Sequence, residues 1–263
     1  SMQITLVQNK VFYKDKARNL DHISSLVANQ NEVGDILLLP ELSTTGYIFN
    51  STEEIHALCE DFSDSETIAT LQNLAKRHNT LVVAGLAEKH GDKFYNSVAV
   101  VDEHGLKTRF RKVSQTNIDK RYFSRGDQLT CFEHKGVKFG IAICFDLWFP
   151  EITREYAKQG IDVLLHPANF GGEYSLHVAR AKALENGYYI VTCNRVGEDV
   201  TEELVGEYRG DSRICTPNGE LIAPFHQKEA IYTLDIECPL PTPRKVLGVE
   251  LLPEMASVSD VLS

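Results

Sequence analysis

The stretch GIAICFDLWFPE, Gly140–Glu151, decides how this chain of 263 residues is interpreted. Its first half is an apolar run typical of a buried strand, and the run ends at Cys144 and Asp146, just before a helix predicted to open at Pro150. Open α/β sheets place their sites at the carboxyl ends of strands. Free cysteine is also among the most buried residues, so Cys144 alone fits a core residue and a nucleophile equally well. A nucleophile would need a nearby base or cation to favour the thiolate.

A second apolar strand also ends in an ionisable group. The stretch LLLPELSTTGY, Leu37–Tyr47, passes from apolar residues through Pro40 to Glu41. Taken alone, Glu41 is more often a solvated loop residue. The order is nevertheless the same as at Cys144, and a partly desolvated carboxylate has a raised pKa and can act as a general base.

A basic segment lies between these two strands in the chain. The stretch RFRKVSQTNIDKRYFSRGD, Arg109–Asp127, begins with Arg109, Arg111 and Lys112. A run of this kind is usually a solvated charged face. The spacing of these basic residues alone does not indicate a function for Lys112 that its neighbours lack.

Apolar strands alternate with amphipathic helices along residues 1–238, and hairpins interrupt them. Helices are predicted after Asp15, over residues 65–79, from Pro150 and near residues 174–186. Hairpin turns are predicted in EKHGDK (88–93), in DEHGLK (102–107) and at Pro217–Asn218–Gly219 within DSRICTPNGELIAPF (211–225). This pattern favours one layered α/β domain with mixed sheets over a purely parallel barrel.

Composition limits the partners. The net charge of −10 argues against nucleic acid and anionic membrane, and no apolar run approaches the ~20 residues of a membrane span. No secretory signal opens the sequence, and its six cysteines are scattered, so we expect a reduced, cytoplasmic protein. No cysteine has metal-like spacing, and no GxGxxG follows a strand, so we expect neither a metal nor a cofactor.

The last segment, residues 239–263, differs from the rest. Prolines are concentrated in it, and its apolar residues show no clear period. We expect an extended C-terminal segment that packs on another surface, such as that of a partner subunit.

Taken together, the three stretches resemble the nitrilase superfamily, the carbon–nitrogen hydrolases. The matching motifs are LLLPELSTTGY with Glu41, FRKVSQTNIDKRYFSRGD with Lys112 and GIAICFDLWFPE with Cys144, together with HPANF (166–170) and ARAKALENGYYIVTCNRVG (179–197). The resemblance covers residues 3 to 237, and the order of the motifs makes it specific.

The resemblance implies an αββα sandwich with mixed sheets, usually paired into a homodimer. It implies a catalytic triad of Glu41, Lys112 and Cys144, and many members have a second glutamate, where this chain has Asp119. Glu41 would carry the proton, while Lys112 would favour the thiolate and later the oxyanion. The backbone N–H of Phe145 would complete the oxyanion site.

Four further residues are weighed as neighbours of this triad. Tyr47 and Trp148 are candidate pocket walls, although aromatic residues are more often core. Asn169, after the strand VLLHPA, is a candidate substrate contact. His166 is expected to be structural.

Members of this superfamily hydrolyse amides, N-carbamoyl groups or nitriles. The nucleophile here reads Cys-Phe-Asp, as in amidase-type branches, whereas many dedicated nitrilases read Cys-Trp-Glu. We expect hydrolysis of an amide of a small carboxylic acid by water, through a cysteine thioester with release of ammonia. Nitrilase and N-carbamoyl amidohydrolase activities remain open. Two other classes are a Cys–His hydrolase that uses Cys144 with His166 or His177, and a non-catalytic binding protein on the same fold.

Overall fold

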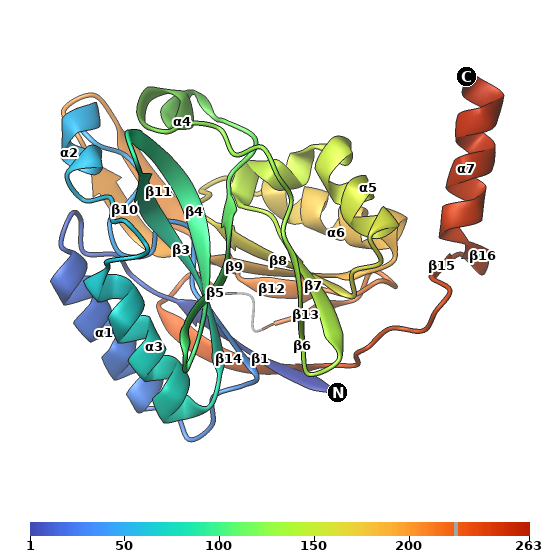
Figure 1. Ribbon diagram of the computed structural model, residues 1–263, viewed down its shortest axis with the longest axis horizontal. Coiled ribbons are helices and arrows are strands. Elements are labelled where there is room, and N and C mark those ends of the chain that lie inside the picture. The colour runs from blue at the N-terminus through green and yellow to red at the C-terminus, as the bar shows by residue number, and fades with distance from the viewer. Residues whose placement is uncertain (224–225) are drawn as a thin grey trace.

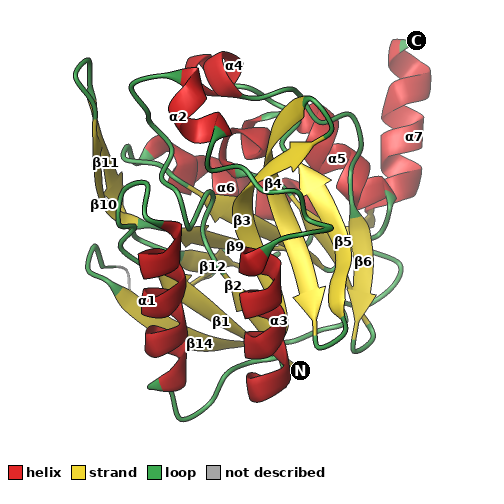
Figure 2. Ribbon diagram, turned by 60° about the vertical axis from the view of Figure 1, so that its left-hand side comes forward, coloured by secondary structure: helices red, strands yellow, loops and turns green. Residues whose placement is uncertain are grey.

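The computed structural model describes residues 1–223 and 226–263. Two six-stranded sheets pack face to face, and helices cover both outer faces (Figures 1 and 2). This is the αββα sandwich with mixed sheets that the motifs predicted.

The first sheet has the order β14-β1-β2-β3-β4-β5. Its strands are β1 (Met2–Gln8), β2 (Ile36–Leu38), β3 (Leu81–His90), β4 (Lys93–Asp102), β5 (Gly105–Arg111) and β14 (Ala230–Ile236). The central strands β1, β2 and β3 are parallel, and the outer pairs are antiparallel. The carboxyl ends of the parallel strands therefore meet at one edge of the sandwich.

The second sheet has the order β13-β12-β9-β8-β7-β6. Its strands are β6 (Cys131–His134), β7 (Val137–Ile141), β8 (Val163–Ala168), β9 (Tyr189–Asn194), β12 (Arg213–Cys215) and β13 (Leu221–Ile222). Its centre, β7, β8 and β9, is also parallel. Two short hairpins stand outside the sheets: β10 (Val196–Val200) with β11 (Val205–Arg209), and β15 (Lys245–Val246) with β16 (Val249–Glu250).

Two helices cover each sheet. Helices α1 (Lys16–Ala28) and α3 (Glu66–His78) pack on the first sheet, and α5 (Pro150–Lys158) and α6 (Tyr174–Asn186) pack on the second. The shorter helical segments are α2 (Thr52–His56), α4 (Asn117–Tyr122) and the 3₁₀ turn η1 (Cys144–Trp148). The side chain of Asp15 accepts a hydrogen bond from Arg18 N and caps α1, as predicted.

Strand β2 shows why the sheets are apolar on both faces. Ile36 and Leu38 point into the core between the sheets, whereas Leu37 packs in the layer beneath α1 and α3. Successive side chains of a strand alternate between faces, so a strand covered on both sides must be apolar throughout. The predicted turns at residues 88–93, 102–107 and 217–219 are also present, with Gly91, Gly105 and Gly219 at positive φ. The last two residues of the third hairpin stretch, 224 and 225, lie outside the described residues.

The prediction of an extended C-terminal segment is wrong for its second half. Helix α7 (Leu251–Leu262) occupies it and stands away from the body (Figure 1). Leu251, Met255, Val258 and Leu262 recur at helical spacing. Pro253 is compatible with this helix because it falls in the first turn, where backbone N–H groups have no partner within the helix.

Candidate active site

Glu41 follows β2 by three residues and is completely buried. Its segment presses against Gly85 of β3. A Cβ at position 85 would lie 2.2 Å from the carbonyl oxygen of Pro40 and 2.6 Å from the Cα of Glu41. Only glycine permits this approach, so β3 fixes where the carboxylate lies.

Lys112 directly follows β5 and is also buried. The alternation of the strand explains its position. Phe110 packs in the inter-sheet core, and Lys112 continues that face, whereas Arg109 and Arg111 point the other way and pair with the buried Glu88. The expectation of a solvated charged face therefore fails for Lys112, whereas Arg109 and Arg111 are partly exposed and pair with a buried carboxylate.

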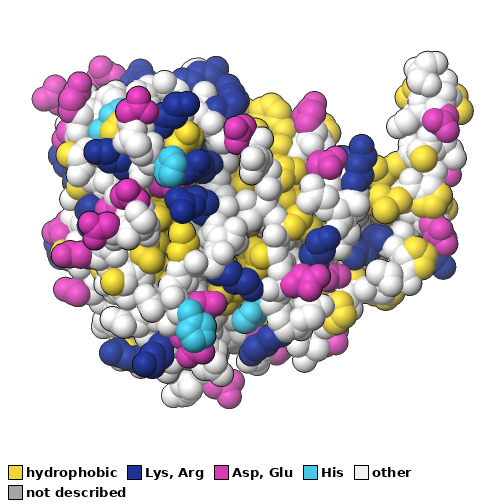
Figure 3. Space-filling view, in the orientation of Figure 1, with side chains coloured by type: hydrophobic (Ala, Val, Ile, Leu, Met, Phe, Trp, Pro, Cys, Tyr) yellow, Lys and Arg dark blue, Asp and Glu magenta, His cyan; other side chains and the backbone are white. Residues whose placement is uncertain are grey.

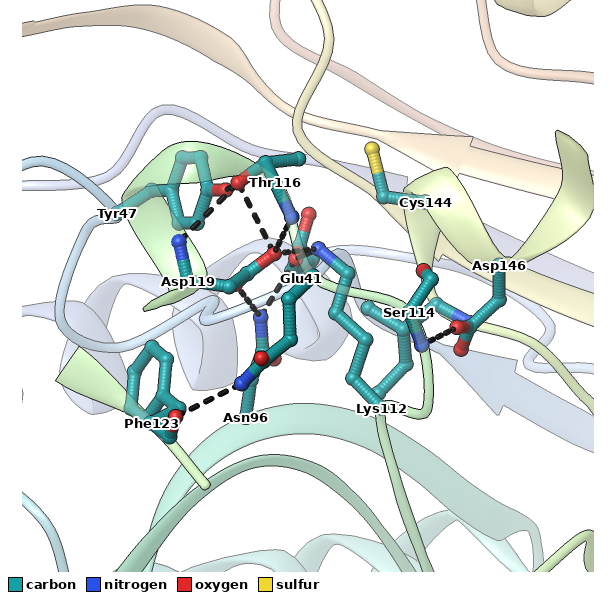
Figure 4. Close-up of polar contacts among 12 residues, drawn as sticks. Glu41, Tyr47, Asn96, Lys112, Ser114, Thr116, Asp119, Phe123, Cys144 and Asp146 are labelled. Carbon is teal, nitrogen blue, oxygen red and sulfur yellow. Dashed lines mark hydrogen bonds and ion pairs between the residues drawn. The ribbon is translucent and has the colours of Figure 1, made fainter. Parts of the chain in front are cut away.

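The Lys112 ammonium lies between two buried carboxylates (Figure 4). Lys112 Nζ is 2.8 Å from Glu41 Oε2 and 2.8 Å from Asp119 Oδ2. Asn96 Nδ2 spans the same pair, donating to Glu41 Oε2 at 2.6 Å and to Asp119 Oδ1 at 3.3 Å. The second glutamate oxygen, Oε1, is buried and has no hydrogen-bond partner among the described residues.

Asp119 is the third residue of the short helix α4 and is held by the capping box of that helix. Thr116 N and Thr116 Oγ1 both donate to Asp119 Oδ2 at 3.0 Å, and Asp119 N donates back to Thr116 Oγ1. The hydroxyl of Tyr47 hydrogen-bonds to Thr116, and its ring centroid lies 5.5 Å from Lys112 Nζ. Tyr47 therefore forms a wall of this cluster.

Cys144 opens the turn η1 with φ at +44°, in the left-handed region that non-glycine residues seldom adopt. His166 Nε2 donates to the carbonyl oxygen of Cys144 at 2.9 Å, and the hydroxyl of Thr192 lies 2.9 Å from His166 Nδ1. Both ring nitrogens are thus engaged, and burial lowers the pKa of His166 to about 4. The imidazole supports the strained turn, which agrees with the structural role expected for it. His177 lies exposed on α6.

Asp146 joins the cysteine turn to the lysine segment. Its Oδ1 accepts from Ser114 N at 2.7 Å and from Val113 N at 3.2 Å, and its Oδ2 accepts from Ile143 N at 3.0 Å. One buried carboxylate therefore sets the position of Cys144 relative to Lys112, because it binds the backbone adjacent to each.

Electrostatics define the resting state of these groups. Burial raises the pKa of the Cys144 thiol, and the negative charge of Glu41 raises it further. Burial also raises the pKa of Glu41, and Lys112 opposes this only in part. Burial alone would lower the pKa of Lys112, but the carboxylates of Glu41 and Asp119 raise it well above its usual value. The resting site therefore holds a thiol, an ammonium and a carboxylate of raised basicity.

The remaining predicted residues surround the cysteine. The backbone of Asn169, which follows β8, lowers the pKa of the Cys144 thiol, and the buried side chain of Asn169 has no hydrogen-bond partner among the described residues. Phe145 lies on η1, where its ring contacts those of Trp148 and Phe149. Trp148 is 39% exposed, so it lines the surface side of the turn.

Sequence reasoning missed a second buried ion pair, between Arg195 and Asp199, at 3.0 Å. Asp199 Oδ2 accepts from Tyr47 N at 2.8 Å and from the Tyr208 hydroxyl at 3.0 Å. This pair fastens the hairpin β10–β11 to the loop that carries Tyr47. The hairpin sequence VGEDV is half polar, so no apolar alternation indicated it.

Over residues 1–223 and 226–263, no group of three or more His, Cys, Asp or Glu side chains is arranged to hold a metal ion. Within the same ranges, no helix is both long and apolar enough to cross a membrane.

An αββα sandwich that places a cysteine beside a buried carboxylate–lysine cluster, where parallel strands end, defines a class of cysteine-dependent hydrolases. The family model described as carbon-nitrogen hydrolase matches residues 3–240. The chain therefore belongs to the carbon–nitrogen hydrolase family, and it is a hydrolase, as its motifs predicted.

Known proteins support this assignment. A nitrilase of Pyrococcus abyssi is 33% identical over 230 residues, which are 87% of this chain and 86% of that protein. An N-carbamoylputrescine amidase of Solanum lycopersicum is 32% identical over 238 residues, 82% of this chain and 79% of that protein. A crystal structure of a CN-hydrolase superfamily protein from Xanthomonas campestris, with an arsenic adduct in its active site, matches with a TM-score of 0.79 and 25% identity over 90% of both chains.

The hydrogen bonds of Asp146 predict that Asp146→Asn destabilises the protein. An amide can accept with one atom only, so at least one buried N–H loses its acceptor, and we expect the free energy of unfolding to fall by about 1–3 kcal/mol. Urea denaturation measures it, with the exposed Asp127→Asn as the control. Equal unfolding midpoints for the two variants would contradict the role of Asp146 in joining the backbone of the cysteine turn to that of the lysine segment.

Proposed function

We propose that this protein hydrolyses an amide of a small carboxylic acid, with Cys144 as nucleophile, Glu41 as proton carrier and Lys112 as the cation that stabilises the oxyanion. One observation carries the proposal. Glu41 has one oxygen fixed by Lys112 and Asn96, while Oε1 is buried without a partner among the described residues, and the charge of Glu41 acts on the Cys144 thiol by raising its pKa. Such an oxygen is available to accept a proton.

The first half of the reaction forms the acyl-enzyme. Glu41 takes the proton of the Cys144 thiol as the sulfur bonds to the carbonyl carbon, because the raised thiol pKa keeps the sulfur protonated at rest. Negative charge develops on the carbonyl oxygen, which the Lys112 ammonium and the N–H of Phe145 stabilise. Glu41 returns its proton to the nitrogen as the carbon–nitrogen bond breaks, and ammonia leaves a thioester.

The second half releases the acid. Glu41, again a carboxylate, takes a proton from water as the water oxygen attacks the thioester carbon. The proton then passes to the Cys144 sulfur as the carbon–sulfur bond breaks. Asp119 takes no proton in this scheme and serves to position Lys112, to which it is ion-paired at 2.8 Å.

Nitrile hydrolysis is the second candidate, because the Pyrococcus abyssi relative is a nitrilase. A substrate panel separates the two. Ammonia release from butyramide, butyronitrile and an N-carbamoyl amine, at equal concentration, should be fastest from the amide. Faster release of ammonia from the nitrile would make nitrile hydrolysis the first candidate and amide hydrolysis the second.

The role of Cys144 predicts a covalent intermediate. With butyramide, mass spectrometry of the wild-type protein should show an adduct of one butyryl group on Cys144. Cys144→Ala should lose both the adduct and turnover while it remains folded by circular dichroism. Turnover that persists in Cys144→Ala would refute the assignment.

The raised pKa of Glu41 predicts the acid limb of the pH profile. The carboxylate must be ionised to accept the thiol proton, so kcat/KM should be present above the pKa of Glu41 and fall as pH drops through it. The midpoint should lie above the ordinary value of 4.5. Glu41→Gln should nearly abolish turnover and remove this limb. An acid limb at or below 4.5 would contradict the prediction.

We also infer that the protein acts in the cytoplasm. All six of its cysteines are free, which suits a reducing compartment.

Helix α7 supports the further proposal of a homodimer. It has no buried residue, and apolar side chains such as Leu252, Val258 and Val261 are exposed on it (Figure 3). The preceding segment is anchored, because Leu240 N and the Arg244 guanidinium both bind Asp162. Leu251 and Met255 contact the body of the chain, but the other apolar side chains of the helix are left exposed, which suits packing against a second copy of the chain.

Removal of α7 alone tests this assembly. The full chain should sediment as a dimer at micromolar concentration. The chain truncated after Glu250, which retains the anchors at Leu240 and Arg244, should sediment as a monomer. Glu254→Gln, on the same helix, is the control and should remain dimeric. A monomeric full chain would refute the proposal.

A further inference from the structure

The side chain of Asn169 stands out among the buried polar groups. Both its Nδ2 and its Oδ1 are buried and have no hydrogen-bond partner within residues 1–223 and 226–263. Buried amides are nearly always hydrogen-bonded, so a side chain with neither atom satisfied points to a ligand that satisfies it. By contrast, Asn194, which ends the neighbouring strand, has its Oδ1 and Nδ2 bonded to Phe170 and Gly210.

The register of β8 places Asn169 on the face that carries the site. Pro167 pairs with Cys193, whose thiol reaches the carbonyl oxygens of Val7 and Leu38 in the first sheet. Asn169 lies two residues beyond Pro167, so an extended chain puts it on the same inter-sheet side. Three residues earlier, His166 Nε2 contacts the carbonyl oxygen of Cys144 at 2.9 Å, and the backbone of Asn169 itself lowers the pKa of the Cys144 thiol.

Among the described residues, the buried acceptors of this region that have no partner include Glu41 Oε1 and Asn169 Oδ1. A primary amide carries two N–H groups on the nitrogen that becomes ammonia. We propose that Asn169 is a specificity-determining residue whose carboxamide binds the carboxamide of the substrate, with Oδ1 accepting the N–H that Glu41 does not engage. This inference rests on the function proposed above and names the feature that selects the amide.

The consequence is selection against acyl compounds that have no N–H. An ester can form the same thioester with Cys144 as its alcohol leaves, but it leaves Asn169 Oδ1 buried without a donor. A site built to hydrogen-bond a substrate N–H strongly disfavours analogues that lack it. Asn169 therefore acts on the choice of substrate and not on the reactivity of the sulfur.

A matched pair of substrates tests this role. Butyramide and p-nitrophenyl butyrate deliver the same acyl group, but only the first has N–H groups. Asn169→Leu keeps the approximate volume of the side chain and removes both polar atoms, while the backbone at this position is unchanged. We expect kcat/KM for butyramide to fall about 10-fold to 100-fold, the scale of a lost buried hydrogen bond, and kcat/KM for the ester to change less than about 2-fold.

The control is Asn186→Leu. Asn186 is also buried with an unpartnered Oδ1, but it ends α6 and precedes β9, at the opposite end of the second sheet from Asn169. Its amide-to-ester ratio should match that of the wild type. Equal losses on both substrates, or on neither, in Asn169→Leu would overturn the inference. A wild type that hydrolyses the ester but no amide, or activity that survives Cys144→Ala, would instead refute the proposed function itself.

Discussion

The site depends on one buried ammonium held between two carboxylates. Lys112 Nζ lies 2.8 Å from Glu41 and 2.8 Å from Asp119, and all three groups are removed from solvent. Burying a charge is costly unless it is paired and hydrogen-bonded. The surrounding residues meet this requirement, because Asn96 donates to both carboxylates and Thr116 caps Asp119. The close approach at Gly85 fixes the position of Glu41 in this cluster, and the capping box of α4 fixes the position of Asp119.

The position of this cluster also explains why the two sheets must keep a fixed separation. Glu41 and Lys112 follow strands of the first sheet, whereas Cys144 follows β7 of the second. A close-packed core between the sheets sets their separation, and Asp146 adds a direct bond by holding the backbone at Ser114 and at Ile143. Cys144 and Lys112, the proposed nucleophile and its proposed cation, thus come from different layers, yet a single carboxylate ties them together.

Much of this arrangement could be predicted from the sequence, because strand ends are visible as apolar runs that stop at an ionisable residue. That signal found Glu41 and Cys144. Lys112 was identified only by family resemblance, although the alternation through Phe110 would have placed it on the inward face and Arg111 on the outward one. The hydrogen bonds accepted by Asp146 and the ion pair of Arg195 with Asp199 join segments that are distant in the sequence. No local pattern encodes such contacts. Helix α7 was missed because its prolines were taken as evidence of an extended chain.

The second carboxylate has a clear purpose in the proposed reaction. At rest the cluster of Glu41, Lys112 and Asp119 carries one net negative charge. When Glu41 takes the thiol proton it becomes neutral, and the negative charge reappears on the oxyanion, which Lys112 also faces. The buried charge is moved over a short distance and is not increased, so little solvation is lost as the barrier is crossed. Asp119, ion-paired to Lys112 at 2.8 Å, holds the ammonium in place when the bond of the ammonium to Glu41 weakens. A site with Glu41 alone would leave Lys112 without a fixed partner at the step where its position matters most.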